Sequence, residues 1–337
     1  MKTIRPVQQT NAGKLYVGDS EKLLSEKLGR DLRGKVQLIF TSPPFPLNVK
    51  KQYGNLQGKD YVDWLSKFAP ILADLITPNG SIVIELGNAW EPKKPIQSLL
   101  PLQALMGFVQ HKNAKLYLCQ EFICHNPTRL PSPAQWVTIE RIRLTDSYTN
   151  IWWMSRTEKP KANNRNILRP YSDSTIKMQK RGEYNDGPRP SGHNISKSGF
   201  LKNNGGSIMP NVIEVEAIDP EKPPRLPGNA FSVAHTNSND YYLRKCKERN
   251  IEPHPARMSL QLVDLFIRFL TDKGDLILDP FAGSNITGFC AESVGRRWVS
   301  IEVNPEYAIH SKIRFSEKLQ KTISKKRKNA SGRKTKR

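Results

Sequence analysis

Short apolar runs alternate with amphipathic segments near both ends of the chain. Residues 14–124 and 256–318 show this alternation. The runs have the length of strands, and the longer segments repeat apolar residues at helical spacing. Strands are predicted at 15–17, 36–40, 81–86, 276–278 and 298–301, and helices at 20–28, 61–75, 98–109, 260–270, 286–293 and 306–315. Such alternation over short connections predicts an α/β fold, with a mostly parallel sheet covered on both faces.

The middle of the chain has a different composition. It is rich in Pro, Asn, Ser, Gly and Arg and has few periodic runs, apart from a buried strand predicted at 149–154. Scattered aromatic residues such as Trp136 and Tyr171 argue against disorder, because disordered segments contain few of them. We therefore predict a recognition region inserted into one scaffold. The predicted divisions are residues 14–124, 125–235, 236–318 and 319–337, the last being a basic tail that is expected to be disordered.

The sequence Thr41-Ser-Pro-Pro-Phe45 directly follows one predicted strand. A loop in this place lies at the carboxyl edge of a parallel sheet, where open α/β folds bind ligands. Pro43 and Pro44 fix two φ angles and remove two N–H donors, which leaves the Ser42 hydroxyl and the Pro43 carbonyl as acceptors in a stiff frame. Two such acceptors suit the exocyclic amine of a nucleobase, and Phe45 offers a plane on which an extruded base can stack. Taken alone, the motif is also consistent with a rigid turn.

A second loop, Asp279-Pro-Phe-Ala-Gly-Ser284, follows another predicted strand and leads into a helix. A nicotinamide site is one interpretation, but the GxGxxG phosphate pattern is absent, and S-adenosylmethionine needs fewer glycines because it has no pyrophosphate. Glu302 directly follows the strand predicted at 298–301, where an acidic residue can bind both hydroxyls of a ribose or simply face solvent. Asp19 can accept a hydrogen bond from an adenine amine, or it can cap the helix that begins at Ser20.

Charge points to a polyanionic partner. Lys and Arg number 53 against 31 Asp and Glu, a net charge of +22. The last 17 residues contain nine of these positive charges and no negative ones, so the remaining chain is still strongly basic. A basic folded region favours nucleic acid as the partner, whereas the C-terminal clusters alone are also consistent with a solvated tail.

The cysteine pattern and the hydropathy of the chain predict the cellular compartment of the protein. The four cysteines, at positions 119, 124, 246 and 290, have neither CxxC spacing nor a zinc pattern, so we expect free thiols, no metal and a reducing cytosol. The N-terminus lacks the apolar run of a secretory signal, and no apolar stretch is long enough to span a bilayer. These features predict a cytoplasmic protein without a membrane partner.

The two loops together carry a family resemblance. Thr41–Phe45 followed much later by Asp279–Ser284 resembles the β-order amino-group DNA methyltransferases, in which the catalytic motif precedes the recognition region and the cofactor motif comes last. Serine at position 42 resembles the motif of the N4-cytosine subgroup, since N6-adenine enzymes usually have Asp or Asn at this position. Further segments, among them residues 53–56, 126–133, 152–153, 189–193 and 254–257, are similar to type II modification enzymes that methylate CAGCTG.

The resemblance covers roughly residues 14–318 and implies a Rossmann-like seven-stranded sheet, S-adenosylmethionine as methyl donor and double-stranded DNA as substrate. It implies that Ser42 and Pro43 hold the target amine, with Pro44 in the same motif, and that Phe45 packs on the base. The implied cofactor residues are Asp19, Asp279, Phe281, Ala282, Gly283, Ser284 and Glu302, with His254 and Pro255 closing the pocket. The family loop commonly reads Gly-Ser-Gly-Thr, whereas this chain has Gly283-Ser-Asn-Ile286.

The resulting hypothesis is a site-specific cytosine-N4 DNA methyltransferase that protects DNA from a cognate restriction endonuclease, without necessarily touching that enzyme. Methylation of adenine N6 is the alternative within the family. A DNA-binding protein that has lost catalysis is the alternative outside it, although both loops are intact. Arginines of the middle region are candidates for contacts with phosphates or guanine edges, namely Arg129, Arg141, Arg143, Arg165, Arg169 and Arg189.

Overall fold

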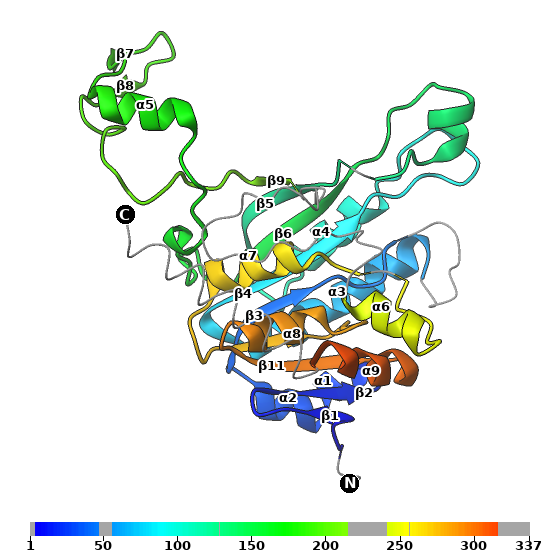
Figure 1. Cartoon of the computed structure of the whole chain (residues 1–337). Helices are drawn as coiled ribbons and strands as arrows, with labels where there is room; N and C mark the ends of the chain where they lie inside the picture. Colours follow the sequence, from blue (N-terminus) through cyan, green and yellow to red (C-terminus); the bar gives the residue numbers. More distant parts are fainter. Residues whose placement is uncertain (1–3, 47–55, 128, 215–240, 256, 316–337) are drawn as a thin grey trace.

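A single twisted sheet forms the centre of the computed structural model, which describes residues 4–46, 56–127, 129–214, 241–255 and 257–315 (Figure 1). Its nine strands lie in the order β1-β2-β11-β10-β3-β4-β6-β5-β9. They are β1 (Gln8–Gln9), β2 (Gly13–Val17), β3 (Val36–Thr41), β4 (Ile76–Gly87), β5 (Tyr117–His125), β6 (Tyr148–Ser155), β9 (Val212–Glu214), β10 (Leu276–Asp279) and β11 (Arg297–Glu302). The strands from β2 to β4 are parallel, and β6 and β5 extend them antiparallel.

Helices cover both faces of the sheet, as the alternating sequence predicts. They are α1 (Ser20–Ser25), α2 (Lys27–Leu32), α3 (Gly58–Leu75), α4 (Leu100–Val109), α7 (Leu260–Leu270), α8 (Ile286–Ser293) and α9 (Pro305–Ser311). Helix α6 (Tyr241–Glu248) packs instead on the segment after α9, and α5 (Asp173–Arg181) lies away from the sheet. Successive residues of a strand point to opposite faces. Accordingly Ile39 packs with α1 to α4, whereas Leu38 and Phe40 pack with α7 and α8. The α/β fold class is therefore confirmed.

Two predicted helices are each divided in the structure. The predicted helix at 20–28 is two helices, because the backbone of Glu26 leaves the helical region (φ −100°, ψ −144°) between α1 and α2. Both short helices direct leucines to the same core. The segment predicted at 306–315 is α9 followed by a 3-10 turn, η3 (Lys312–Phe315). The other predicted helices and strands agree with the structure to within a few residues at their ends, apart from β4, which begins at Ile76.

The predicted strand at 149–154 is β6, and it lies inside the main sheet. It pairs with β4 on one side and with β5 on the other. The predicted division at residue 125 therefore falls between two strands of one sheet. The polypeptide leaves this sheet in two places, at residues 126–147 and after Ser155, and Figure 1 shows the two resulting projections rising on opposite sides of the molecule.

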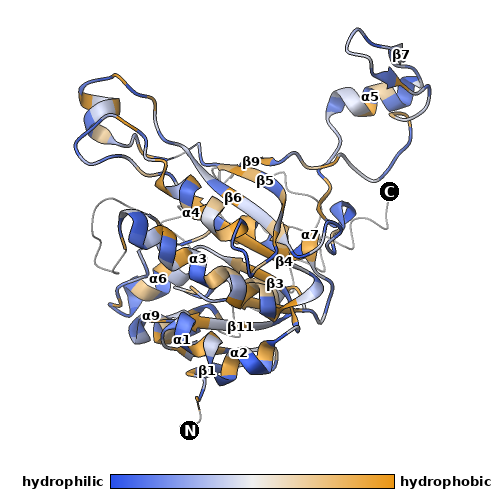
Figure 2. Cartoon of the chain, turned by 180° about the vertical axis from the view of Figure 1, so that it is seen from behind, coloured by the Kyte–Doolittle hydropathy of each residue, from blue (hydrophilic) through white to orange (hydrophobic). Residues whose placement is uncertain are grey.

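Hydrophobic residues are concentrated on the strands of the sheet and in the helices against it, whereas both projections mix hydrophilic and hydrophobic segments (Figure 2). The second projection contains α5 and the two-stranded ribbon of β7 (Gly187–Pro188) and β8 (Asn194–Ile195). Within the described residues, no helix combines the length and the apolar character needed to span a bilayer. The basic tail predicted at 319–337 lies outside the described residues.

Candidate active site at the carboxyl edge of the sheet

The two loops singled out in the sequence adjoin each other in space. Strands β3 and β10 are parallel neighbours, and each ends where its loop begins. The Oγ1 hydroxyl of Thr41, the last residue of β3, donates a hydrogen bond of 2.8 Å to Oδ1 of Asp279, the last residue of β10. From this pair the chain proceeds outward in opposite directions, from β3 to β4 and from β10 to β11. Ligands of open α/β sheets bind at such a switch point.

Asp279 connects the loops from a fully buried position. Besides Thr41, its carboxylate accepts hydrogen bonds from Oγ1 of Thr287 at 2.6 Å and from the backbone N–H of Phe281 at 3.1 Å. Burial nevertheless raises the pKa of Asp279 to about 6, and the neighbouring Glu302 adds to this rise, against the lowering by the three donors. Asp279 therefore holds two strand ends together, which is a positioning role rather than a demonstrated ligand contact.

The raised pKa of Asp279 makes a prediction about stability. Because this pKa is about 6 in the fold against its usual 3.8, the folded chain binds the proton more tightly than the unfolded chain. The contribution is therefore present below about pH 4 and is lost as the pH rises through 6. Relative to Asp279→Asn, the wild-type protein should lose on the order of 2–3 kcal/mol between pH 4 and 7. Urea unfolding of both proteins at each pH measures this difference, and a constant difference would contradict it.

A glycine turn places three predicted cofactor residues together. Gly283 has a left-handed backbone (φ +50°), and a Cβ there would lie 3.1 Å from the ring of His254. Its N–H donates to Oε2 of Glu302 at 2.7 Å, while Oε1 of Glu302 accepts from the N–H of Asn304 at 2.9 Å. Burial raises the pKa of Glu302. Glu302 is thus buried at the base of the turn rather than solvated on the surface.

The end of β2 joins the same edge. The N–H of Gly18 donates to the carbonyl of Glu302 at 3.0 Å, and the hydroxyl of Ser20 donates to the carbonyl of Pro280. Asp19 lies between these contacts, is exposed, and caps α1 by accepting from the N–H of Lys22 at 2.9 Å. The capping interpretation of Asp19 is therefore correct, and its contact with an adenine remains a prediction.

The remaining predicted cofactor residues differ in where their side chains lie. Phe281 packs in an aromatic cluster with Trp64 and Phe68 of α3, at centroid distances of 5.5 and 5.2 Å. Ala282 is buried, and its N–H donates to the carbonyl of Ile301. Pro255 is exposed, directly after His254. These positions bring Phe281 and Ala282 to the base of the turn and leave Pro255 at its rim.

Ser284 contacts a residue that sequence reasoning missed. Arg314, in η3, is 4% exposed and donates from Nε to the Ser284 carbonyl at 2.9 Å and from Nη2 to the Ser284 hydroxyl at 3.0 Å. Its guanidinium also lies 4.3 Å from the ring centre of Tyr242, whose hydroxyl accepts from the N–H of His254. Arg314 thus holds the glycine turn directly and supports His254 through Tyr242. Its sequence context, Lys312-Ile-Arg314, offers no signal that separates it from a surface arginine.

Residues 42–45, which follow β3 and are here called the acceptor loop, are held by contacts with β4 and α3, and Ser42 remains partly accessible. Ser42 is half-buried, and its hydroxyl makes a long contact of 3.4 Å to the carbonyl of Glu85, while Pro43 is buried. The carbonyl of Pro44 accepts from the hydroxyl of Tyr61 at 2.7 Å. The ring of Phe45 lies against Gly87, where a Cβ would come within 2.5 Å of it. Phe45 is therefore fixed by β4, and stacking of a base on its other side stays a prediction.

Glu85 is a second residue that the sequence prediction missed. It lies on β4 beside Ser42, is 5% exposed, and accepts a hydrogen bond of 2.9 Å from the hydroxyl of Thr149. Burial raises the pKa of Glu85, against smaller lowering effects of Thr149 and Arg129. A buried carboxyl with a raised pKa beside a candidate acceptor loop has the properties of a proton acceptor. A charged residue inside the apolar run at 81–86 was the available signal.

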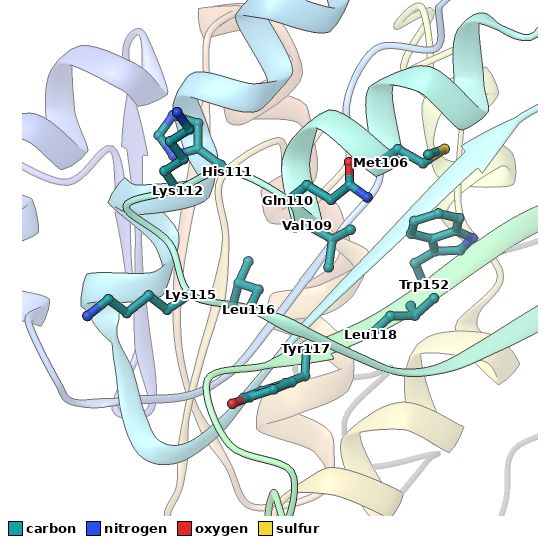
Figure 3. A pocket seen from close by; sticks show the side chains of 10 residues that line it. All are labelled: Met106, Val109, Gln110, His111, Lys112, Lys115, Leu116, Tyr117, Leu118 and Trp152. Carbon is teal, nitrogen blue, oxygen red and sulfur yellow. The ribbon is translucent and has the colours of Figure 1, made fainter.

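Other candidate features lie elsewhere. No group of three or more His, Cys, Asp or Glu side chains among the described residues is placed to hold a metal ion. A hollow of about 650 Å³ lies between α4 and strands β5 and β6 (Figure 3), and none of the predicted site residues lines it. The geometry therefore centres on the edge formed by β2, β11, β10, β3 and β4.

Comparison with known proteins agrees with this geometry. Residues 36–312 match the family model of N6/N4 DNA methylases, described as "DNA methylase". The type II methyltransferase M.PvuII of Proteus hauseri is 38% identical over 92% of this chain and 86% of its own length, and M.BamHI of Bacillus amyloliquefaciens is 22% identical over 96% and 62%. The solved PvuII DNA methyltransferase, titled cytosine-N4-specific, superposes with a TM-score of 0.69 at 30% identity, covering 97% of this chain and 95% of that one. The chain therefore belongs to the N6/N4 DNA methylase family.

Proposed function

We propose that this protein transfers a methyl group from S-adenosylmethionine to the N4 amine of a cytosine in double-stranded DNA. The observation that carries the proposal is the hydrogen bond between Thr41 and Asp279, which joins the acceptor loop to the cofactor loop at the switch point of the sheet. The similarity to M.PvuII and to a solved methyltransferase titled cytosine-N4-specific supports cytosine over adenine. CAGCTG is the proposed site, and protection against a matching restriction endonuclease is the proposed purpose.

The residues at the edge fit the proposed cofactor. The turn at Gly283 is closed on one side by the ring of His254, and its N–H is held by Glu302, so the turn is fixed before any ligand binds. A carboxylate oxygen has more than one acceptor position, so Glu302 can hold ribose hydroxyls while it keeps its backbone partners. Asp19 is one residue from the Gly18 contact to Glu302 and has exposed carboxylate for an adenine amine. S-adenosylmethionine would supply an electrophilic methyl group at this position.

The acceptor loop would prepare the target amine. A cytosine amine is a weak nucleophile, because its lone pair is delocalised into the ring. The Ser42 hydroxyl and the Pro43 carbonyl would accept hydrogen bonds from its two N–H groups. These hydrogen bonds would favour a pyramidal nitrogen and stabilise the positive charge that grows on it. Glu85 would then take the proton that the nitrogen loses, since its carboxyl lies on β4 beside the acceptor loop and burial raises its pKa above the usual value for glutamate. Phe45 would support the ring of the extruded base.

A labelled-methyl experiment tests the proposed function. The protein is incubated with duplex DNA containing CAGCTG and methyl-labelled S-adenosylmethionine, and the DNA is digested to nucleosides. We expect label in N4-methylcytosine and none when the site is changed to a sequence of the same composition. Label in N6-methyladenine would instead support the adenine alternative, and an absence of label in any nucleoside would contradict the proposal.

Arg314 provides a prediction about cofactor affinity. Arg314→Lys keeps the charge but cannot make the paired contacts to the carbonyl and hydroxyl of Ser284. We expect the Kd for S-adenosylmethionine, measured by calorimetry, to rise about tenfold, which equals the loss of roughly one charge-assisted hydrogen bond. Arg296→Lys is the matched control, because Arg296 is 7% exposed and similarly bonded, to Thr271 and Val294. An equal loss of affinity in both variants would mean that Arg314 acts only through stability.

A further inference from the structure

The projection formed by the described residues between 126 and 147, here called the aliphatic arm, exposes large apolar side chains. Leu144 is 89% exposed and Leu130 is 81% exposed, more than any other large hydrophobic residue in the described part of the chain. Ile139 and Ile142 on the same arm are 67% and 48% exposed. Figure 1 shows the arm projecting from the sheet beyond β5 and β6. Large apolar side chains gathered on one exposed segment indicate a binding surface rather than a core.

Hydrogen bonds within the aliphatic arm fix this exposure. The N–H of Asp146 donates to the carbonyl of Ser132 at 3.0 Å, which joins the two sides of the arm. The turn beyond them is closed by the N–H of Ile142, which donates to the carbonyl of Trp136 at 2.9 Å. No residue of the arm from 129 to 147 is buried. The leucines are therefore presented on an ordered backbone that has no core of its own to bury them.

The base of the aliphatic arm is attached beside the acceptor loop. Asn88, at the end of β4, donates from Nδ2 to Oδ1 of Asp146 at 2.8 Å, and Arg129 donates from Nη1 to the carbonyl of Tyr148 at 3.1 Å. Asn88 is three residues beyond Glu85, a separation of about 10 Å along a strand. Leu130 directly follows Arg129, and Leu144 lies two residues before Asp146. Both leucines thus lie within two residues of the contacts that attach the arm at the carboxyl edge of the sheet.

The positive charge around these leucines indicates what kind of partner the arm binds. Arg129 precedes Leu130, and the exposed Arg141 and Arg143 precede Leu144. The two acidic groups of the arm are occupied, Glu140 by the amide of Gln135 and Asp146 by Asn88. Arginines beside an apolar surface favour a polyanion, whereas a second copy of a chain with net charge +22 would repel it. Duplex DNA offers both phosphates for the arginines and an apolar base stack for the leucines.

We propose that Leu130 and Leu144 enter the base stack of the DNA and occupy the space left when the target cytosine swings out. This inference rests on the proposed function, because only an amine that must leave the duplex needs such a wedge. Apolar side chains inserted between base steps separate the bases, and filling the vacated space keeps the extruded base from returning. The two leucines are positioning residues, since they touch neither the amine nor the cofactor. The opposite projection, with Lys177, Lys180 and Arg181 on α5, is suited to phosphates instead.

The test compares DNA that needs a wedge with DNA that does not. Leu144→Ala, Leu130→Ala and the double variant are assayed in single turnovers on a matched CAGCTG duplex and on one with an abasic site opposite the target cytosine. We expect the double variant to be slowed 10- to 100-fold on the matched duplex and less than threefold on the unpaired target, because an unpaired base is already easy to extrude. Met106→Ala is the control, since Met106 is 48% exposed in the hollow between α4 and β5.

A fluorescent base analogue at the target position reports extrusion without turnover. The wild-type protein should raise its fluorescence on binding, and the double variant should lose most of that rise at saturating protein. Equal slowing on both duplexes, or no slowing on either, would overturn the wedge. A change of sedimentation coefficient in the leucine variants would also overturn it and would assign the arm to an interface between copies. Absence of transfer by the wild type, with the fluorescence difference intact, would contradict the proposed chemistry and leave the wedge standing.

Discussion

Ser42→Ala should reduce kcat about 100- to 1,000-fold, the loss that follows removal of one preorganised acceptor from a polar active site. Removal of the hydroxyl should disturb the structure little. Its contact with the carbonyl of Glu85 is long, at 3.4 Å, and the loop is held independently by the prolines and by Tyr61. The Kd values for DNA and for S-adenosylmethionine should therefore stay within about twofold of wild type, because the acceptor acts on charge that develops during transfer. Single-turnover rates and equilibrium titrations on the same preparation measure the two effects separately.

Ser293→Ala is a suitable control for the Ser42 variant. Ser293 is also partly buried and donates to a backbone carbonyl, that of Cys290, but it lies at the far end of α8. We expect its kcat to remain at the wild-type value. Full activity of Ser42→Ala would remove the Ser42 hydroxyl from the chemistry. A fall in DNA affinity as large as the fall in kcat would instead assign Ser42 to substrate binding.

The sheet could largely be predicted from the sequence because its strands are local signals. Apolar runs such as the one at 36–40 are buried on both faces, and the intervening helices have one apolar side. Pairing between distant segments is not a local signal. Strand β6 joins β4 across more than 60 residues, so its composition indicated a buried strand without indicating which sheet it entered. The short strands β1 and β9 extend the implied seven strands to nine for the same reason, since two or three residues give no pattern.

The site was predicted at the level of loops but not at the level of side-chain contacts. The motifs placed Ser42 and Gly283 at one edge because both follow strands of a parallel sheet. They could not show that Asp279 faces Thr41 or that Ser284 faces Arg314, since each pair joins residues far apart in the chain. In both pairs, a predicted cofactor residue, Asp279 or Ser284, is hydrogen-bonded to another side chain of the protein. Glu85 was also missed, although a charged residue within the apolar run at 81–86 is a signal that the sequence itself contains.

Glu302→Gln should weaken binding of S-adenosylmethionine about 100-fold. The substitution keeps the size of the side chain but replaces one of its two acceptor oxygens by a donor. The N–H groups of Gly283 and Asn304 each donate to a different carboxylate oxygen of Glu302, so the single oxygen of the amide would leave one of these two donors without its present partner. It also removes the charge proposed to hold the ribose hydroxyls. Charge-assisted hydrogen bonds contribute about 1.5–3 kcal/mol, and about 3 kcal/mol corresponds to a 100-fold change in Kd.

The pH dependence of binding separates this role of Glu302 from a structural one. Burial raises the pKa of Glu302, so its carboxylate takes up a proton at a higher pH than an exposed glutamate does. If the ionised form binds the ribose, wild-type affinity decreases as the pH is lowered through this pKa, whereas the affinity of Glu302→Gln changes less, because only other groups such as Asp279 still titrate there. Calorimetric titration between pH 5 and 8 compares the wild type and Glu302→Gln with the control variant Glu306→Gln. Glu306 is an exposed glutamate in the first turn of α9, so this control should behave as wild type. Parallel pH curves for Glu302→Gln and wild type would refute the assignment, because a merely unpaired backbone donor does not titrate in this range.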